Sequence, residues 1–349
     1  MNDPKNFDKK MKNTCINQNI YASGYGTYKA CPFYPTIRFS YLPNANIPDP
    51  IGIANVFTVN RHPIDVIFEI TEKGIKTLDI HNDVPMMIYP MGRDFIGTNY
   101  ESRDGIIDEN IILRTNYSFL LKKSSNLLPL KTDTDILYTK SVVVIRDNTY
   151  TLLSHEHLYK MSICTVFPPN DLHLLDHQDA HNNHHNNHSS KLLSSKNIIT
   201  FQMIMESVFQ AAICGHHKVI VLSLFPPDLN IPLSDQVMIF NYCILKYGTL
   251  FKDIVIAIPP YMGGVDMIDY VDQHIVKPQE ITKEVDNLFA EKQMKRSLEM
   301  KRSLEMKQDE PIKDERIIYQ HMLNMTPDEK VIMIQNMLKN KNKKIIKTI

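Results

Sequence analysis

The stretch IITFQMIMESVFQAAICGHHKVIVLSLF (198–225), followed by SDQVMIFNYCILKYG (234–248) and DIVIAIPP (253–260), decides the fold. Its first part predicts an amphipathic helix that Gly215 ends, and then a short apolar strand. The second part predicts a helix capped by Ser234, and the third a second apolar strand. Strands this apolar are buried on both faces, and a single linking helix makes them parallel neighbours. The sequence therefore predicts an α/β layer with ligands in the loop after the first strand.

The preceding residues extend this layer. Apolar, β-branched runs predict further strands at 53–59, 65–70, 85–89, 140–146 and 160–167. GIIDENIILRTNYSFLLKK (105–123) predicts one helix. Residues 1–50 are polar and then rich in proline, so we expect an irregular arm. Residues 51–262 are expected to form a three-layer α/β/α domain with a mixed sheet.

Two segments depart from the composition of a packed domain. Residues 172–196 are rich in His and Asn and cannot bury enough apolar surface to fold, so we expect a flexible surface insertion. Deleting 173–195 should then change the stability little. Residues 263–349 are charged and helical in pattern, with KRSLEM at 295–300 repeated at 301–306. We expect a helical extension that could contact a protein partner.

Composition and charge exclude several classes of protein. The 39 basic and 39 acidic residues balance, so nothing argues for nucleic acid or an anionic membrane as a partner. The polar opening MNDPKNFDKKMKN predicts no signal peptide, and no apolar run approaches the ~20 residues that span a bilayer. The five cysteines show no CxxC spacing, which favours buried free thiols in a reducing compartment. We therefore expect a cytoplasmic protein.

No metal or cofactor motif stands out. The insertion gathers six histidines, which could bind zinc, copper or nickel: His173, His177, His181, His184, His185 and His188. No cysteine or regular carboxylate accompanies them, and their spacing defines no tetrahedral site. The chain also lacks GxxxxGK[ST], GxSxG and HExxH. We expect no metal site and no cofactor.

The order of the parts is as informative as their composition. An apolar strand leads into a glycine-containing loop, and an acidic pair then opens a helix that carries an arginine. VVVIRDNTY (142–150), CTVFPPN (164–170) and the helix–strand–helix–strand finish follow. In this order residues 53–260 resemble the microbial-type poly(ADP-ribose) glycohydrolase domain, a branch of the macrodomain fold. The resemblance implies a macrodomain-like mixed sheet and a glycohydrolase acting on ADP-ribosyl bonds.

The catalytic signature of that family is altered in this chain. The family pattern is Gln-Glu-Glu at a helix start with an arginine following, and its second glutamate is the general acid. Aligned on Arg114, the three positions hold Asp108, Glu109 and Asn110. An amide cannot deliver a proton at neutral pH. The resemblance therefore leaves Glu109 and Asp108 as the candidate catalytic carboxylates.

The two ligand-binding loops are altered as well. Residues 89–97 (YPMGRDFIG) hold Gly92 where the family has a glycine triplet. Residues 223–235 (SLFPPDLNIPLSD) correspond to a glycine-rich phosphate loop, but their prolines lack the N–H groups that a phosphate needs. The resemblance assigns ligand binding to six residues: Gly92, Arg93, Asp94, Gly97, Ser223 and Asp228.

Three functions stay open at this point. The first is a divergent, catalytically impaired macrodomain that binds ADP-ribose or a related nucleotide as a binding or interaction module. The second is an active ADP-ribosyl glycohydrolase that uses Glu109 or Asp108, although acidic residues at a helix start also serve simply to stabilise the helix. The third is an α/β scaffold with no ADP-ribose ligand that acts through its C-terminal helices. Binding of ADP-ribose separates the first two from the third, and turnover separates the second from the first.

Overall fold

The computed structural model describes most of the predicted domain and little of the termini. The described residues are 18, 35–43, 45, 47–74, 84–91, 109–128, 130–169, 172, 174–176, 191–226, 230–260, 262, 264–280 and 283. The chain divides into two compact units, Met1–Val276 and Lys277–Ile349. The tandem repeat and the last predicted helix lie outside the described residues.

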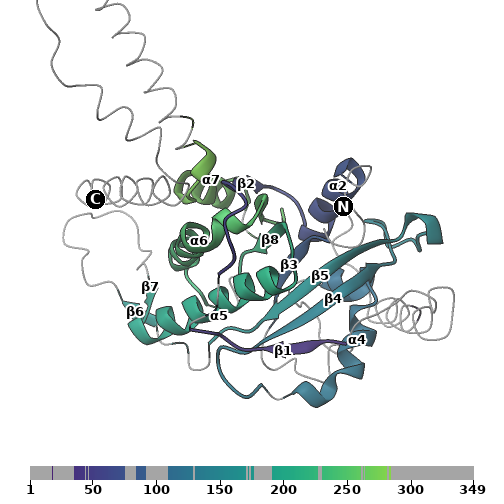
Figure 1. The fold of residues 1–349 in the computed structure, drawn as a ribbon, viewed down its shortest axis with the longest axis horizontal. Helices are drawn as coiled ribbons and strands as arrows, with labels where there is room; N and C mark the ends of the chain where they lie inside the picture. Colours follow the sequence, from purple (N-terminus) through teal and green to yellow (C-terminus); the bar gives the residue numbers. More distant parts are fainter. Residues whose placement is uncertain are drawn as a thin grey trace, which may run out of the picture. The chain divides into compact units, whose positions relative to one another are not determined.

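A seven-stranded mixed sheet forms the middle layer of the first unit (Figure 1). Its strands are β1 (Ile37–Phe39), β2 (Asn55–Val59), β3 (Met86–Pro90), β4 (Ile136–Val144), β5 (Tyr159–Val166), β8 (Val219–Ser223) and β9 (Asp253–Ala257). Their order across the sheet is β1-β4-β5-β3-β8-β9-β2. The strands from β5 to β2 run parallel, whereas β4 is antiparallel to both of its neighbours. The predicted parallel pairing of β8 and β9 is confirmed.

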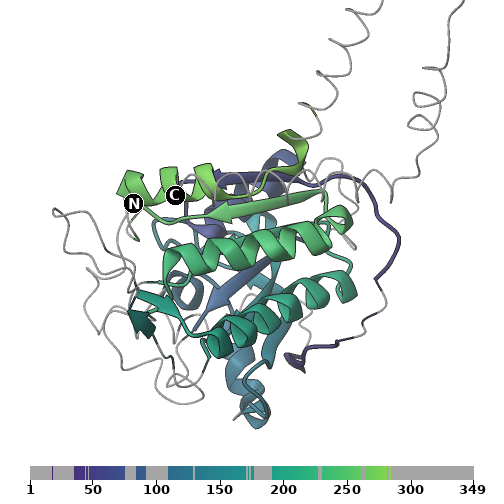
Figure 2. The same cartoon turned by 90° about the vertical axis from the view of Figure 1, so that its left-hand side faces the viewer.

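Helices cover both faces of this sheet. They are α2 (Pro63–Gly74), α3 (Glu109–Arg114), α4 (Tyr117–Lys123), α5 (Ser195–Cys214), α6 (Leu233–Tyr247) and α7 (Gly264–His274), with short 3-10 turns at Ser125–Leu127, His155–His157 and Gly248–Leu250. Helices α5, α6 and α7 pack on one face, where α5 and α6 lie side by side in Figure 2. Helices α2, α3 and α4 pack on the other. The α/β/α layering predicted from the sequence is confirmed.

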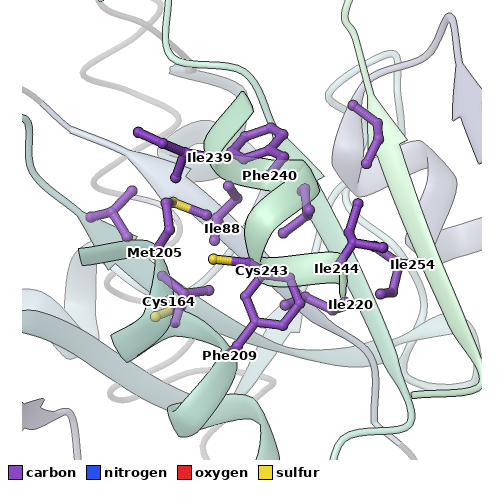
Figure 3. Close-up of a cluster of buried hydrophobic side chains, with 14 of the residues drawn as sticks. Ile88, Cys164, Met205, Phe209, Ile220, Ile239, Phe240, Cys243, Ile244 and Ile254 are labelled. Carbon is purple, nitrogen blue, oxygen red and sulfur yellow. The ribbon is translucent and has the colours of Figure 1, made fainter. Parts of the chain in front are cut away.

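Alternate side chains of the buried strands point to opposite faces of the sheet, so a separate hydrophobic core lies on each face. In β8, Ile220 and Leu222 face α5 and α6, whereas Val221 faces the α2 side. Figure 3 shows the first core, in which Met205 and Phe209 of α5 meet Phe240 and Ile244 of α6 over the sheet. Each such side chain contributes about 1.5–3 kcal/mol by burial. Helix α5 is long and apolar enough to cross a membrane by length and composition, but most of it is buried here, as expected of a core helix.

A buried carboxylate joins α5 to α6. Glu206 is 2% exposed, and its Oε2 accepts hydrogen bonds from Lys246 Nζ at 2.6 Å and from the Tyr247 hydroxyl at 2.7 Å. Burial alone would raise the pKa of Glu206, but hydrogen bonds from Lys246, Tyr247 and Gln202 outweigh it and lower that pKa. Gln210, one turn further along α5, bonds both the amide and the carbonyl of Leu42 in the N-terminal arm. The arm is thus tied to the helical layer.

The strand predicted at 65–70 is wrong, because these residues belong to helix α2. Pro63 occupies the first helical position, where its fixed φ and missing N–H suit a helix start. Asp65 lies in the first turn and complements the helix dipole. The β-branched content of DVIFEI concealed these two signals.

The single helix predicted at 105–123 is divided in two, α3 and α4. The break lies at Thr115 and Asn116, because Asn116 pairs with β4 instead of continuing the helix. Its amide donates to the Val143 carbonyl at 3.1 Å, and its Oδ1 accepts from the Val143 amide at 2.9 Å. Thr115 Oγ1 then accepts from the amide of Tyr117 and restarts the helix.

Four smaller expectations also need correction. Part of the arm predicted to be irregular, Ile37–Phe39, is the edge strand β1. The segment after Pro260 contains α7, which belongs to the first unit. Ser234 lies inside α6 and caps nothing, since the residue before the helix is Pro232. Of the thiols in the described residues, Cys164 and Cys243 are buried as expected, but Cys214 is exposed.

The His/Asn-rich insertion has structured ends. Its flanks form a two-stranded antiparallel sheet of β6 (Leu174–Asp176) and β7 (Lys191–Leu193). Leu193 is 2% exposed, and the Ser194 side chain caps α5 by accepting from the Asn197 amide. Removal of 173–195 would take away a core residue and a helix cap. The segment that could be dispensable therefore narrows to 177–190, which lies outside the described residues.

A buried histidine closes the turn between α5 and β8. His217 is 3% exposed, its Nδ1 donates to the Val84 carbonyl at 2.6 Å, and its Nε2 lies 2.7 Å from the Tyr138 hydroxyl. A neutral ring therefore accepts from Tyr138. A Cβ at Gly215 would lie 2.5 Å from that hydroxyl, so only glycine fits there. Burial lowers the pKa of His217 to about 4, although the bond to Val84 opposes it.

We predict that His217 makes the fold sensitive to acid. Its folded pKa, about 4, lies below its ordinary value of 6.5, so its contribution is complete above 6.5 and is lost as the pH falls through that window. Between about pH 7.5 and pH 5 the loss is ~2 kcal/mol of unfolding free energy. Urea unfolding across this range should show that extra slope in the wild type and not in His217→Gln. Equal slopes in both proteins would contradict the assignment.

Candidate functional site

The candidate site lies at the carboxyl edge of the parallel strands. Pro90 of β3 pairs with Val166 of β5, while Ser223 of β8 and Val59 of β2 both pair with Ala257 of β9. Because these five strands are parallel, their carboxyl ends meet at one edge of the sheet. In open α/β sheets this edge is where ligands bind. The loops that resemblance to the glycohydrolases assigned to ligand binding all leave from it.

The structure describes part of the predicted site. Asn110 and Ser223 are described with their side chains, and Glu109 is described as the first residue of α3. The remaining predicted residues lie outside the described part of the chain: Asp108, Gly92, Arg93, Asp94, Gly97 and Asp228. Ser223 is 3% exposed at the end of β8, so its hydroxyl is not presented at the surface. The arrangement of the first loop therefore stays a prediction.

The Asn110 side chain is held by Tyr150, which lies in the turn after β4. It is 7% exposed, and its Oδ1 accepts a hydrogen bond of 2.6 Å from the Tyr150 hydroxyl. Tyr150 is also buried and has a φ of 65°, a left-handed conformation uncommon for a non-glycine residue. The turn 147–150 fixes this tyrosine, since the Tyr150 carbonyl accepts from Arg146. The position that the resemblance aligns with the family's general acid thus holds a buried amide that is hydrogen-bonded to Tyr150.

Arg114 has a structural role. It is 3% exposed, its NH1 donates to Asp65 Oδ1 at 2.8 Å, and its Nε lies 3.4 Å from the Arg146 carbonyl. The Arg114 carbonyl in turn accepts from the Ile145 amide at 2.9 Å. Arg114 therefore ties α3 to α2 and to the end of β4. It sets the position of the helix that begins with Glu109 and Asn110.

The loop between β8 and α6, which we call the β8–α6 loop (224–232), has both of its described ends bound to one side chain. Gln236 of α6 is 2% exposed and accepts from the Phe225 amide at 2.7 Å. Its Nε2 donates to the carbonyls of Phe225 at 3.0 Å and of Ile231 at 2.8 Å. The Phe225 ring packs edge-on against Phe201 with 4.8 Å between centroids. Both ends of the loop are therefore anchored to the protein interior.

An acidic side chain lies beside Gln236 in the first turn of α6. Asp235 is 5% exposed, and its Oδ2 accepts from the Leu193 amide at 2.8 Å. Burial raises the pKa of Asp235, although the bond from Leu193 opposes the shift. The first turn of this helix thus carries its own carboxyl group.

No group of three or more His, Cys, Asp or Glu side chains that could hold a metal ion occurs within the described ranges. Of the six histidines of the insertion, none has a described side chain. For the histidines of the insertion, the expectation that they form no metal site therefore rests on the sequence pattern alone.

No family model matches the chain, and no curated protein matches it. Solved structures do. Poly(ADP-ribose) glycohydrolase from Thermomonospora curvata superposes with a TM-score of 0.54 at 12% identity, covering 76% of this chain and 99% of that one. The same enzyme bound to the inhibitor ADP-HPD gives a TM-score of 0.52 at 12% identity, over 75% and 98% of the two chains. The chain therefore has a poly(ADP-ribose) glycohydrolase-like, macrodomain-type fold, as the order of its parts predicted.

Sequence reasoning missed three side chains that take part in these contacts. Asp65 was concealed by the wrong assignment of α2 as a strand. Tyr150 and Gln236 gave no local signal, because each acts on a residue that only the fold brings near, Asn110 and Phe225. Both are tertiary hydrogen bonds, and a single sequence carries no pattern for them.

We predict that loss of the Arg114 side chain destabilises the domain. Arg114→Met leaves the Asp65 carboxylate largely buried without its cation, a loss that typically costs ~3–5 kcal/mol. The double variant Arg114→Met/Asp65→Asn should recover part of that loss, because the uncompensated charge is gone. Chemical denaturation gives the unfolding free energies of the wild type, the single variant and the double variant.

The matched control is Arg61→Met. Arg61, which precedes α2, pairs with Glu69 of that helix, but the Arg61 side chain is 55% exposed, so the variant should lose less than about 1 kcal/mol of unfolding free energy. Equal losses for Arg61→Met and Arg114→Met would refute the structural role of Arg114.

Proposed function

We propose that this protein is a divergent macrodomain that binds ADP-ribose or a related nucleotide at the carboxyl edge of its sheet and does not hydrolyse it. The observation that carries the proposal is Asn110, a buried amide bonded to Tyr150 at the position aligned with the general acid. Departure of a ribosyl-linked oxygen needs a proton, and a general acid contributes typically 10²–10⁴-fold to the rate. An amide at neutral pH supplies none. The fold supports the binding part of the proposal, and the T. curvata enzyme was solved with an inhibitor bound.

The neighbouring carboxylates are poor substitutes for the missing acid. Glu109 and Asp108 stand one and two positions before Asn110 in the sequence, and not at the position aligned with the general acid. A general acid has to lie within hydrogen-bond reach of the oxygen that it protonates. An active glycohydrolase that uses Glu109 or Asp108 would therefore need its substrate in a different orientation.

A second function, a scaffold without a nucleotide ligand, is favoured by a specific observation. The Phe225 amide, in the loop that corresponds to the family's phosphate loop, is taken by Gln236. If both binding loops are closed in this way, the domain would serve only as a platform for protein partners. The C-terminal segment, 277–349, is the candidate for such contacts, and a cytoplasmic location also stays a proposal.

We predict binding without turnover. Titration calorimetry of the full chain with ADP-ribose should show saturable binding, and incubation with ADP-ribosylated protein should release no ADP-ribose. Asn110→Asp is the isosteric control, since it restores a carboxyl group without adding volume beside Tyr150. Neither it nor Asn110→Glu should gain activity, because an acid without a well-positioned substrate contributes little.

Three outcomes would change the conclusion. Absence of ADP-ribose binding would favour the scaffold. Release of ADP-ribose by the wild type, abolished in Glu109→Ala, would show that Glu109 serves as the acid. Activity in Asn110→Glu alone would show that substrate positioning is intact and that only the acid is missing.

A further inference from the structure

The seven-stranded sheet ends at β1, a strand of three residues. In the described part of the chain β1 pairs with β4 alone, and Figure 1 shows it at the margin of the sheet. Its first residue, Ile37, is 46% exposed. An edge strand carries backbone N–H and C=O groups that can pair with the edge of another molecule. β1 is therefore a surface at which two copies of this chain could join.

The middle residue of this edge strand, Arg38, is a charged residue in an unfavourable environment. It lies opposite Leu137 of β4, so its side chain is on the face of the sheet that α2, α3 and α4 cover. Its Nη2 donates to the Leu127 carbonyl at 2.7 Å. Its Nε and Nη1 are buried and have no hydrogen-bond partner in the described part of the chain. Burying such donors unpaired costs free energy, so stability alone does not account for an arginine at this position.

The geometry of a joined sheet gives Arg38 a second role. Two identical edges pair around a two-fold axis, which makes the two β1 strands antiparallel. A strand of three residues pairs along its full length in one register only, with its middle residue opposite itself. Arg38 would then face Arg38 of the second copy on the same face of the sheet, with Cβ atoms about 4.5–5.5 Å apart. Like charges in this position repel, and the added strand would also take both guanidinium groups further from water.

We propose that β1 is a self-association edge of this domain and that Arg38 prevents two copies of the chain from joining there. The partner that this surface fits is a second copy, with the exposed Ile37 as the apolar part of the contact. Proteins commonly protect edge strands with short length and inward-pointing charge, and β1 has both features. The inference concerns the assembly of the domain, so it does not depend on the proposed nucleotide binding.

The test compares the self-association of full-length variants by sedimentation velocity over a range of concentrations. Arg38→Met keeps the length of the side chain without its charge, and it should dimerise at least roughly tenfold more tightly than the wild type. Arg38→Thr, a second neutral variant with a residue suited to strands, should do the same. Arg38→Lys keeps the charge and should match the wild type. Arg61→Met is the matched control, because Arg61 is an exposed arginine outside the sheet, and it should also match the wild type.

A second change places the contact on β1. Ile37→Lys, added to Arg38→Met, should return self-association to the wild-type level, because lysine on an edge strand opposes pairing. Three results would overturn the proposal. The first is equal self-association of the wild type and both neutral variants, and the second is a dimer of Arg38→Met that persists with Ile37→Lys. The third is unfolding of both neutral variants in circular dichroism, since Arg38 would then be required for stability.

Discussion

The structure depends on a set of parallel strands that are buried on both faces. All five residues of β3 and all five of β8 are buried, and only one residue of β9, Asp253, is not. Parallel neighbours need crossover connections, and the buried faces need apolar covers, so α5, α6 and α2 are required by the strands themselves. The same geometry brings five strand ends together at one edge. The position of the candidate site is therefore a consequence of the sheet.

Short apolar runs made this sheet predictable from the sequence. KVIVLSL and DIVIAI are too short for helices, rich in β-branched residues and separated by one amphipathic helix, and they form the predicted parallel pair. The run DVIFEI carries the same local signal but is a helix, because Pro63 and the packing of α2 on the sheet outweigh its propensity. The edge strand β1 was missed because three residues, Ile37–Phe39, are ordered only by pairing with β4. Local patterns thus identified the buried strands and missed elements that tertiary contacts define.

The site was less predictable than the fold. The sequence identified Asn110 as an amide at an acid's position, and this residue is indeed at the start of α3. What the amide does could not be predicted, because its partner Tyr150 is 40 positions away and lies in a strained turn. The bond between Gln236 and Phe225 could not be predicted either, because a proline-containing loop separates the two residues in the sequence. In each pair, the hydrogen bond joins two residues that only the fold brings together, so a local sequence pattern gives no sign of it.

The central claim is our proposal that the carboxyl edge of the sheet binds a nucleotide and that Asn110, which is hydrogen-bonded to Tyr150, supplies no general acid. The most direct measurement is ¹⁵N–¹H amide spectroscopy of the full chain during titration with ADP-ribose. We predict saturable shifts confined to amides at that edge, such as Met91 and Ser223, with the nucleotide unchanged at the end of the titration. Amides at the opposite edge, such as Val219 and Asp253, should not move. An absence of shifts at the carboxyl edge, or shifts elsewhere in the domain, would contradict the account.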